Sequence, residues 1–218
     1  MFRFFHPKKE EETMKKLAAL VAGGLLLCGG VGVATADSRG SRCEEFGGTL
    51  KLTALKTCDE FKAVRKKERI FEDALFVYEL PPQYQPQEAV CFSGEIKDAS
   101  LGGRPVEASS LSAFTVNSFN TLLDLLPTDP LPAPVFTAAT VVTVSADREP
   151  RKDKQLGQIF LRDTGVFLPA AADDPRGPVA IEQLIGVGGT KKFAKASVSI
   201  EIAGHEFAGA PLKGTICR

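Results

Sequence analysis

Residues 156–203 constrain the fold more than any other part of the chain. They contain three strand-like runs, 156–168, 179–187 and 196–202, in which β-branched and aromatic residues are frequent. A loop of Pro, Ala and Asp separates the first two runs, and a Gly-Gly pair follows the second. Strand signals this close together, with turns between them and no helical periodicity, predict antiparallel strands joined by short connections.

Similar signals recur through the rest of residues 91–217. Residues 92–97 alternate in polarity, residues 135–146 are apolar on both faces, and a last run lies at 212–216. About seven or eight such runs and almost no helix predict a mainly β fold, a closed antiparallel β-barrel of about eight strands. A β-sandwich is the alternative that this pattern leaves open. An eight-stranded barrel has room inside only for side chains or for one small ligand.

The N-terminus predicts export. A Lys-Lys pair at 15–16 precedes an apolar run that ends in Ala-Thr-Ala at 34–36. This is the pattern of a secretory signal peptide, here cleaved after Ala36, whether translation starts at Met1 or at Met14. A membrane-spanning helix is the alternative, but the five glycines of the run and its A-x-A ending favour cleavage. We therefore expect a secreted or periplasmic protein with no membrane span in its mature part.

The charge of the mature chain excludes a large class of partners. The chain has 27 basic and 27 acidic residues, and residues 1–36 hold five of the former and three of the latter, which leaves 22 and 24. A net charge near −2 gives no electrostatic footprint for nucleic acid or for an anionic membrane. We divide the chain into a signal peptide (1–36), an N-terminal disulfide-bearing elaboration (37–90) and the barrel domain (91–218).

Four cysteines remain after cleavage: Cys43, Cys58, Cys91 and Cys217. In an exported chain an even number of cysteines predicts disulfides, and four of them allow three connectivities. We favour Cys43–Cys58, which closes a short loop, and Cys91–Cys217, which would join the first and last strands of the barrel domain. Zinc is a poor alternative because the chain has no C-x-x-C pair and only one mature histidine. We expect no metal and no cofactor.

The elaboration shows mixed signals. Residues 49–55 alternate as a strand does, and residues 75–80 read as another strand that ends at a Pro-Pro pair. Between them, Asp59 is placed to cap a short helix whose apolar residues recur at helical spacing. The basic cluster at 65–67 is interpreted as a solvated helix face rather than a binding patch.

The segments GQIFLRDTGVF and IGVGGTKKFAKASVSIEI resemble the strand–loop–strand pattern of the barrel that dirigent proteins share with allene oxide cyclase. The matching residues are Asp163, Gly165, Val166, Phe167, Gly188, Gly189, Thr190, Phe193, Ala194 and Ala196. Two departures stand out: Lys191-Lys192 lies where a Gly and a basic residue are usual, and Ser197 replaces a glycine. The close match covers about a quarter of the chain and is more specific for fold than for activity.

The resemblance implies a barrel around an apolar cavity, often in a trimer. Plant members guide phenoxy-radical coupling or cyclise an unstable fatty-acid epoxide, and they use no cofactor. Such work requires confinement of the ligand, a few interior polar groups and exclusion of water. By this resemblance we expect a small apolar ligand in the barrel and a homo-oligomer.

Arg162 and Asp163 are the candidate polar groups of such a cavity. They point to opposite faces of their strand, and Asp163 shares a face with Ile159 and Leu161. We therefore place Asp163 inside, where burial would raise the pKa of its carboxyl and suit it to acid–base work. The alternative is a hydrogen-bonded aspartate that shapes a turn at Asp-Thr-Gly.

No sequence motif specifies a reaction. His205, the one mature histidine, falls at an expected hairpin tip, no G-x-S-x-G is present, and the GVGGTKK stretch lacks the spacing of a phosphate loop. Three functions remain open. They are a barrel that binds a small apolar molecule or a partner without catalysis, a cofactor-free isomerase, cyclase or coupling guide, and a structural or inhibitory module. The module would bind proteins through loops 128–134 and 169–178.

Overall fold

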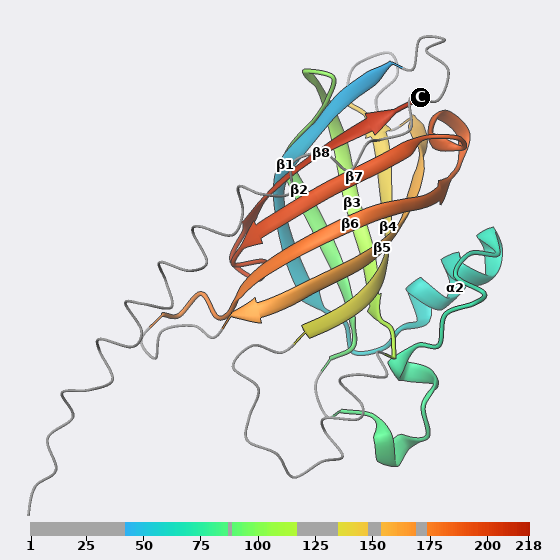
Figure 1. The fold of residues 1–218 in the computed structure, drawn as a ribbon, viewed down its shortest axis with the longest axis vertical. Coiled ribbons are helices and arrows are strands. Elements are labelled where there is room, and N and C mark those ends of the chain that lie inside the picture. The colour runs from blue at the N-terminus through green and yellow to red at the C-terminus, as the bar shows by residue number, and fades with distance from the viewer. Residues whose placement is uncertain (1–41, 87–88, 117–134, 148–153, 169–173) are drawn as a thin grey trace, which may run out of the picture. The chain divides into compact units, whose positions relative to one another are not determined.

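The structure is a computed structural model that describes residues 42–86, 89–116, 135–147, 154–168 and 174–218. These residues form a closed antiparallel barrel in which each strand pairs with the next and the first pairs with the last (Figure 1). The strands are β1 (Cys43–Ala54), β2 (Cys91–Leu101), β3 (Arg104–Phe114), β4 (Val135–Ala146), β5 (Gln155–Leu168), β6 (Val179–Gly189), β7 (Ser197–Gly204) and β8 (Ala210–Cys217). The predicted eight-stranded barrel is confirmed, and the sandwich is excluded.

The barrel begins earlier than the sequence indicated. Residues 43–54 form β1, which pairs with β2 on one side and with β8 on the other. This strand closes the barrel, so it belongs to the barrel rather than to an elaboration in front of it. Among the described residues, 55–86 and 89–90 lie between β1 and β2 and form no strand of the ring.

The up-and-down order gives the barrel two distinct ends. The ends of β1, β3, β5 and β7 and the starts of β2, β4, β6 and β8 lie at one end, which we call the mouth end. The start of β1 and the end of β8 lie at the opposite end, which we call the terminal end. Alternating side chains fill the interior between them, and the largest fully buried ones include Phe46, Ile159, Leu161, Phe193, Ile200 and Ile216. Most of this core lies toward the terminal end.

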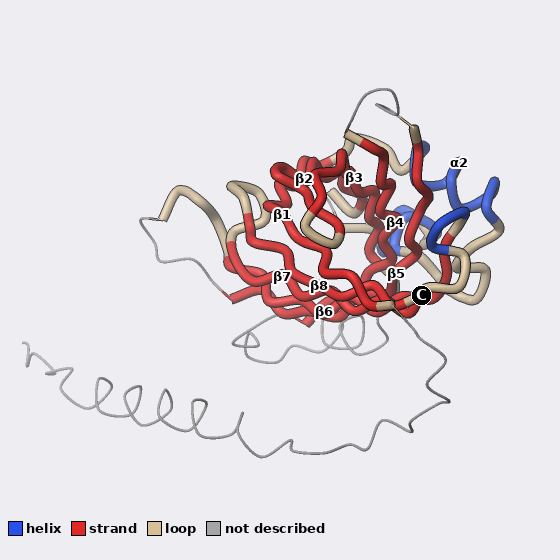
Figure 2. The backbone as a smooth tube through the Cα atoms, turned by 90° about the horizontal axis from the view of Figure 1, so that it is seen from above, coloured by secondary structure: helices blue, strands red, loops and turns tan. Residues whose placement is uncertain are grey.

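A second hydrophobic layer, which we call the outer layer, covers the outside of β3, β4 and β5. It comes from residues 55–80, which include α2 (Asp59–Glu68) and the 3₁₀ turn Val77–Glu79, and α2 lies outside the ring of strands (Figure 2). Its buried residues are Cys58, Phe61, Phe71, Phe76, Cys91, Ala113, Ala139, Val141 and Phe160. This layer explains why β4 is apolar on both faces: one face lines the barrel and the other lies under these aromatic rings.

The prediction of a strand at 75–80 is wrong. Only Phe76 forms an isolated bridge, to Thr115, and the residues after it turn as a 3₁₀ helix. The predicted helix is confirmed, but Asp59 lies in its first turn and makes no cap, since the N-cap position is Cys58.

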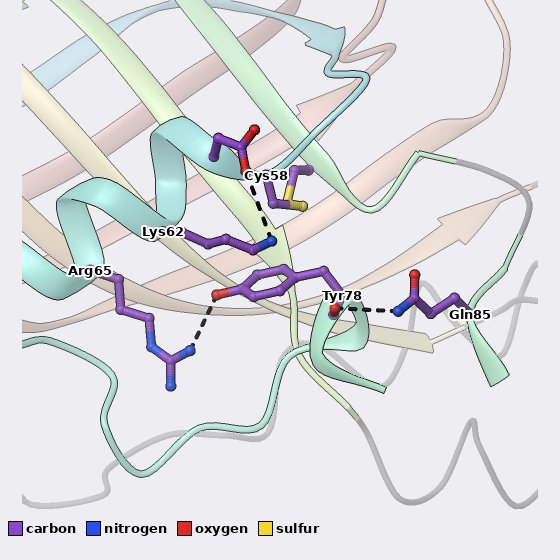
Figure 3. The surroundings of a disulfide bond; sticks show 7 residues. Cys58, Lys62, Arg65, Tyr78 and Gln85 are labelled. Carbon is purple, nitrogen blue, oxygen red and sulfur yellow. Dashed lines mark hydrogen bonds and ion pairs between the residues drawn. A yellow bond between two sulfur atoms is a disulfide. The ribbon is translucent and has the colours of Figure 1, made fainter. Parts of the chain in front are cut away.

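The disulfides are Cys43–Cys217 and Cys58–Cys91, so both favoured pairings are wrong. Cys43 and Cys217 are direct partners on the paired strands β1 and β8, with 3.9 Å between their Cα atoms. Cys58 and Cys91 join the two ends of the segment that leaves the barrel (Figure 3). Two disulfides indicate that the chain folds in an oxidising compartment.

Arg65 of α2 organises the outer layer instead of facing solvent. Its guanidinium donates a hydrogen bond to Tyr78 Oη at 3.2 Å (Figure 3). It also donates to Glu79 Oε1 at 2.5 Å and to the carbonyl oxygens of Phe71 and Ala74. It also lies over the Phe76 ring, 4.6 Å from the centroid. The interpretation of residues 65–67 as a solvated face is therefore wrong for Arg65.

None of the helices in the described part of the chain has the length and apolar character needed to cross a membrane.

Candidate ligand cavity at the mouth end

A small cavity lies inside the barrel toward the mouth end. Its volume, counted as the space open to the centres of water molecules, is about 30 Å³. This is room for about two waters or one thin molecular group. Most of its walls are apolar, with side chains from all eight strands and from the β7–β8 turn.

Five phenylalanines form a continuous chain of rings around this end of the cavity. In order they are Phe207, Phe92, Phe114, Phe136 and Phe167, and neighbouring ring centroids lie 4.4 to 5.9 Å apart. Four of them lie at the mouth ends of strands β2, β3, β4 and β5, and Phe207 lies in the β7–β8 turn. Phe207 is 39% exposed, which makes it the outermost ring of the chain.

Asp163 lies on the cavity wall at the middle of β5 and is only 4% exposed. The Thr140 hydroxyl donates to Asp163 Oδ2 at 2.5 Å, and the Ser112 and Thr140 hydroxyl oxygens are 2.7 Å apart. Since the Thr140 hydrogen goes to the carboxylate, Ser112 is the donor of the second bond. Asp163 Oδ1 has no hydrogen-bond partner among the described residues.

Burial raises the pKa of Asp163 from 3.8 to about 7. The removal of the carboxylate from water is the largest cause, and the nearby charge of Glu206 adds to it, while the Thr140 hydrogen bond acts in the opposite direction. A carboxyl with such a pKa can give up or take a proton near neutral pH.

Glu182 and Glu206 add two further carboxyls to the cavity wall. Burial raises the pKa of both groups, and Glu182 is also raised by the charge of Glu206. A hydrogen bond between the two side chains raises the pKa of Glu182 further and lowers that of Glu206, so the pair can share one proton. Gly165 leaves the space that this arrangement needs, because a Cβ there would lie 2.9 Å from Glu182 Cγ and 2.5 Å from Phe136 Cζ.

The β7–β8 turn brings Glu206 into the barrel. The turn folds toward β1, where Leu52 N donates to the Glu206 carbonyl oxygen at 2.8 Å. His205 Nδ1 lies 2.9 Å from the Gly177 carbonyl oxygen and ties the turn to the residues before β6. As a result the Glu206 side chain is 2% exposed, although it lies in a turn.

Arg162 and Asp163 face opposite sides of β5, as expected. Arg162 lies on the outer face, where Nη2 donates to Asp73 Oδ1 at 2.6 Å, so it takes no part in the cavity. The alternative in which Asp163 shapes a turn is wrong, because β5 continues without a break from Gln155 to Leu168.

The sequence did not reveal Glu182 or Glu206. Glu182 lies in a strand with apolar residues on both faces, so alternation does not say which face is inside. The outer face of that strand carries the exposed side chains, including Ile181, Ile185 and Val187. Glu206 sits in a turn, where a charged residue is usually solvated. Glu182 pairs with Gly165, which lies two residues after Asp163 on the same face of β5. This pairing would have placed Glu182 inside the barrel, but it can be recognised only when the register of β5 and β6 is known.

The cavity has the chemistry of an acidic, aromatic pocket. Among the described residues, no Lys, Arg or His side chain lines it, and no group of three His, Cys, Asp or Glu side chains is arranged to hold a metal ion.

The loops predicted to bind proteins lie largely outside the described residues, at 128–134 and 169–173.

Comparison with protein-family models, with curated proteins and with solved structures gives no significant match.

Proposed function

We propose that the mouth-end cavity binds a small apolar ligand and that the chain is a secreted or periplasmic binding protein without catalytic activity. The observation that carries this proposal is an aromatic cavity with buried polar atoms that have no partner among the described residues: Ser110 Oγ, Asp163 Oδ1 and Glu206 Oε1. Buried polar atoms in native proteins are almost always satisfied by protein, water or ligand. Apolar walls with a few convergent polar atoms are typical of ligand sites.

The size of the cavity limits the ligand. A space of about 30 Å³ takes a thin group, and the half-exposed Phe207 ring is one of its lining side chains. A long fatty-acid chain does not fit this space, which favours a smaller ligand over the substrates of the plant enzymes.

The experiment is a titration with 1-butanol, a neutral and thin apolar probe, followed by the methyl signals of the protein in NMR spectra. We expect saturable shifts at Leu52, Leu184 and Ile202, which line the cavity, and none at Val141 in the outer layer. The absence of saturable shifts at the cavity methyls with 1-butanol, and also with n-butylamine, would refute the proposal.

Two matched variants make this test specific. Ala138→Leu fills the cavity from β4 and should abolish the saturable shifts, because Ala138 lines the space. Ala203→Leu makes the same change on the exposed outer face of β7 and should leave them intact. Equal loss of binding in both variants would contradict a site inside the barrel.

Export is part of the proposal. The signal-like sequence before residue 37 and the oxidising environment that the two disulfides require support it. N-terminal sequencing of the exported protein should find Asp37 as the first residue. The trimer implied by the dirigent and allene oxide cyclase resemblance stays a prediction, which light scattering tests.

The second candidate function is a cofactor-free isomerase of the dirigent or allene oxide cyclase type. It is favoured by one observation, the buried Asp163 carboxyl with a pKa of about 7 on the cavity wall. Such a group can move a proton at a confined carbon atom. Deuterium uptake from heavy water into a small ketone, compared between the protein and Asp163→Asn, tests it; equal rates would exclude it.

A further inference from the structure

The buried polar atoms of the cavity that have no partner indicate the chemistry of the ligand more closely than the apolar walls of the cavity do. Asp163 and Glu206 are 4% and 2% exposed, and each has one carboxyl oxygen with no hydrogen-bond partner among the described residues. Carboxylate oxygens accept hydrogen bonds and cannot donate them. When ionised, each of these two oxygens therefore lacks a donor.

The charge of the cavity points to a cationic donor. Three carboxyls, Asp163, Glu182 and Glu206, line it, and no basic side chain of the described residues does. Glu182 and Glu206 can share a proton, but Asp163 has only the Thr140 hydroxyl as a partner. A buried carboxylate is stable only when it is paired with a positive charge or protonated.

The aromatic rings suit the same ligand. Aromatic faces attract a cation through their negative quadrupole and also cover apolar groups. The chain of rings that starts at Phe207 lies next to the carboxyls on the cavity wall. An anionic ligand would instead meet three acidic groups.

Resting on the proposed function, we infer that the ligand is a small apolar amine, whose ammonium group donates to Asp163 and Glu206 while its apolar body lies against the Phe rings. The amine supplies the donor that both free oxygens require and the positive charge that the cavity lacks. A charge-assisted hydrogen bond in this setting is stronger than the bond that a neutral hydroxyl makes to the same oxygen.

The test compares three probes of the same length: n-butylamine, 1-butanol and butyrate. At about pH 8, above the pKa of Asp163, the amine should bind at least about tenfold more tightly than the alcohol, and butyrate should not bind. Alcohol binding as tight as amine binding would overturn the inference and leave the proposed function intact. If none of the three binds, the proposed function fails as well.

A matched pair of variants locates the preference. Asp163→Asn keeps the acceptor for Thr140 and removes the charge, so the ratio of amine to alcohol affinity should fall by about tenfold or more. Asp73→Asn removes an exposed carboxylate on the outer face and should leave the ratio unchanged. An unchanged ratio in Asp163→Asn would overturn the inference.

A second readout needs no variant. The titratable groups that face Asp163 in the cavity are Glu182 and Glu206. Binding of the cation requires the Asp163 carboxyl to lose its proton, so amine affinity should rise by about tenfold per pH unit from about pH 5 to about pH 7. The affinity of 1-butanol should not rise with pH; parallel curves for the two probes would contradict the inference.

Discussion

Replacement of Asp163 by asparagine should stabilise the protein in alkaline solution and leave it almost unchanged in acid. The folded-state pKa of Asp163 is about 7, whereas the ordinary value is 3.8. Each pKa unit corresponds to about 1.4 kcal/mol, so ionisation of this buried group costs the folded state about 4 kcal/mol.

The direction of this pH dependence follows from the number of protons that the folded and unfolded states bind. Between about pH 4 and about pH 7 the folded state keeps a proton on Asp163 that the unfolded state has lost, so stability falls as pH rises through this window. Asparagine does not ionise and still accepts the Thr140 hydrogen bond. Asp163→Asn should therefore match the parent at about pH 4 and exceed its free energy of unfolding by about 4 kcal/mol at about pH 8.

Urea denaturation at a series of pH values measures both proteins, with the disulfides kept intact. Asp73→Asn is the control, because Asp73 is 79% exposed and pairs with Arg162 on the outer face. It should change stability by less than about 0.5 to 1 kcal/mol at either pH. A variant at Asp163 that is less stable than the parent at pH 8, or equally stable at both pH values, would refute a buried carboxyl in an apolar cavity.

Three further variants, one of them a double substitution, test the outer layer and the cavity wall by urea denaturation. Replacing both Cys58 and Cys91 by serine opens a loop with a sequence separation of 33 and should lower the free energy of unfolding by about 4 kcal/mol. Proteolysis of the segment between the two positions should become faster; unchanged protection would show that the disulfide does not hold this segment in place. Arg65→Ala should cost about 2 to 3 kcal/mol, because it removes charge-assisted bonds from the outer layer, whereas the exposed Lys67→Ala should change stability by less than about 0.5 kcal/mol. Gly165→Ala places a methyl group 2.5 Å from an aromatic carbon and should cost about 1 to 3 kcal/mol; unchanged stability would show that the site has free space.

The strands were predictable because alternation and turn residues report local structure. β7 is an example, since its alternating apolar residues Val198, Ile200 and Ile202 all lie inside the barrel. The face of Asp163 followed from the same alternation, because Ile159 and Leu161 share its side of β5. These inferences need only the two-residue period of a strand.

The cysteine pairing was not predictable in this way. Local loop length favoured Cys43–Cys58, but pairing in a barrel is set by which strands are neighbours around the closed ring. Cys43 meets Cys217 because the first strand pairs with the last, a contact that spans 174 residues. Alternation at residues 49–55 revealed a strand there but did not reveal its partners.

The rest of the cavity was hidden for a similar reason. Glu182 faces inward on a strand whose exposed outer face is apolar, which reverses the usual pattern. Glu206 enters the barrel because its turn bonds back to Leu52 of β1, a contact between distant parts of the chain. Arg65 lies in a basic cluster whose sequence resembles a solvated helix face. Its partners lie in residues 71–79, and local sequence does not show that these residues fold against α2.

Titration of the side-chain carboxyl carbons by NMR would report directly whether the barrel encloses ionisable groups in an apolar cavity. We expect Asp163 to titrate near pH 7 and Glu182 and Glu206 to titrate above the ordinary range of a glutamate. Titration of Asp163 near pH 4, as for a solvated aspartate, would contradict the account.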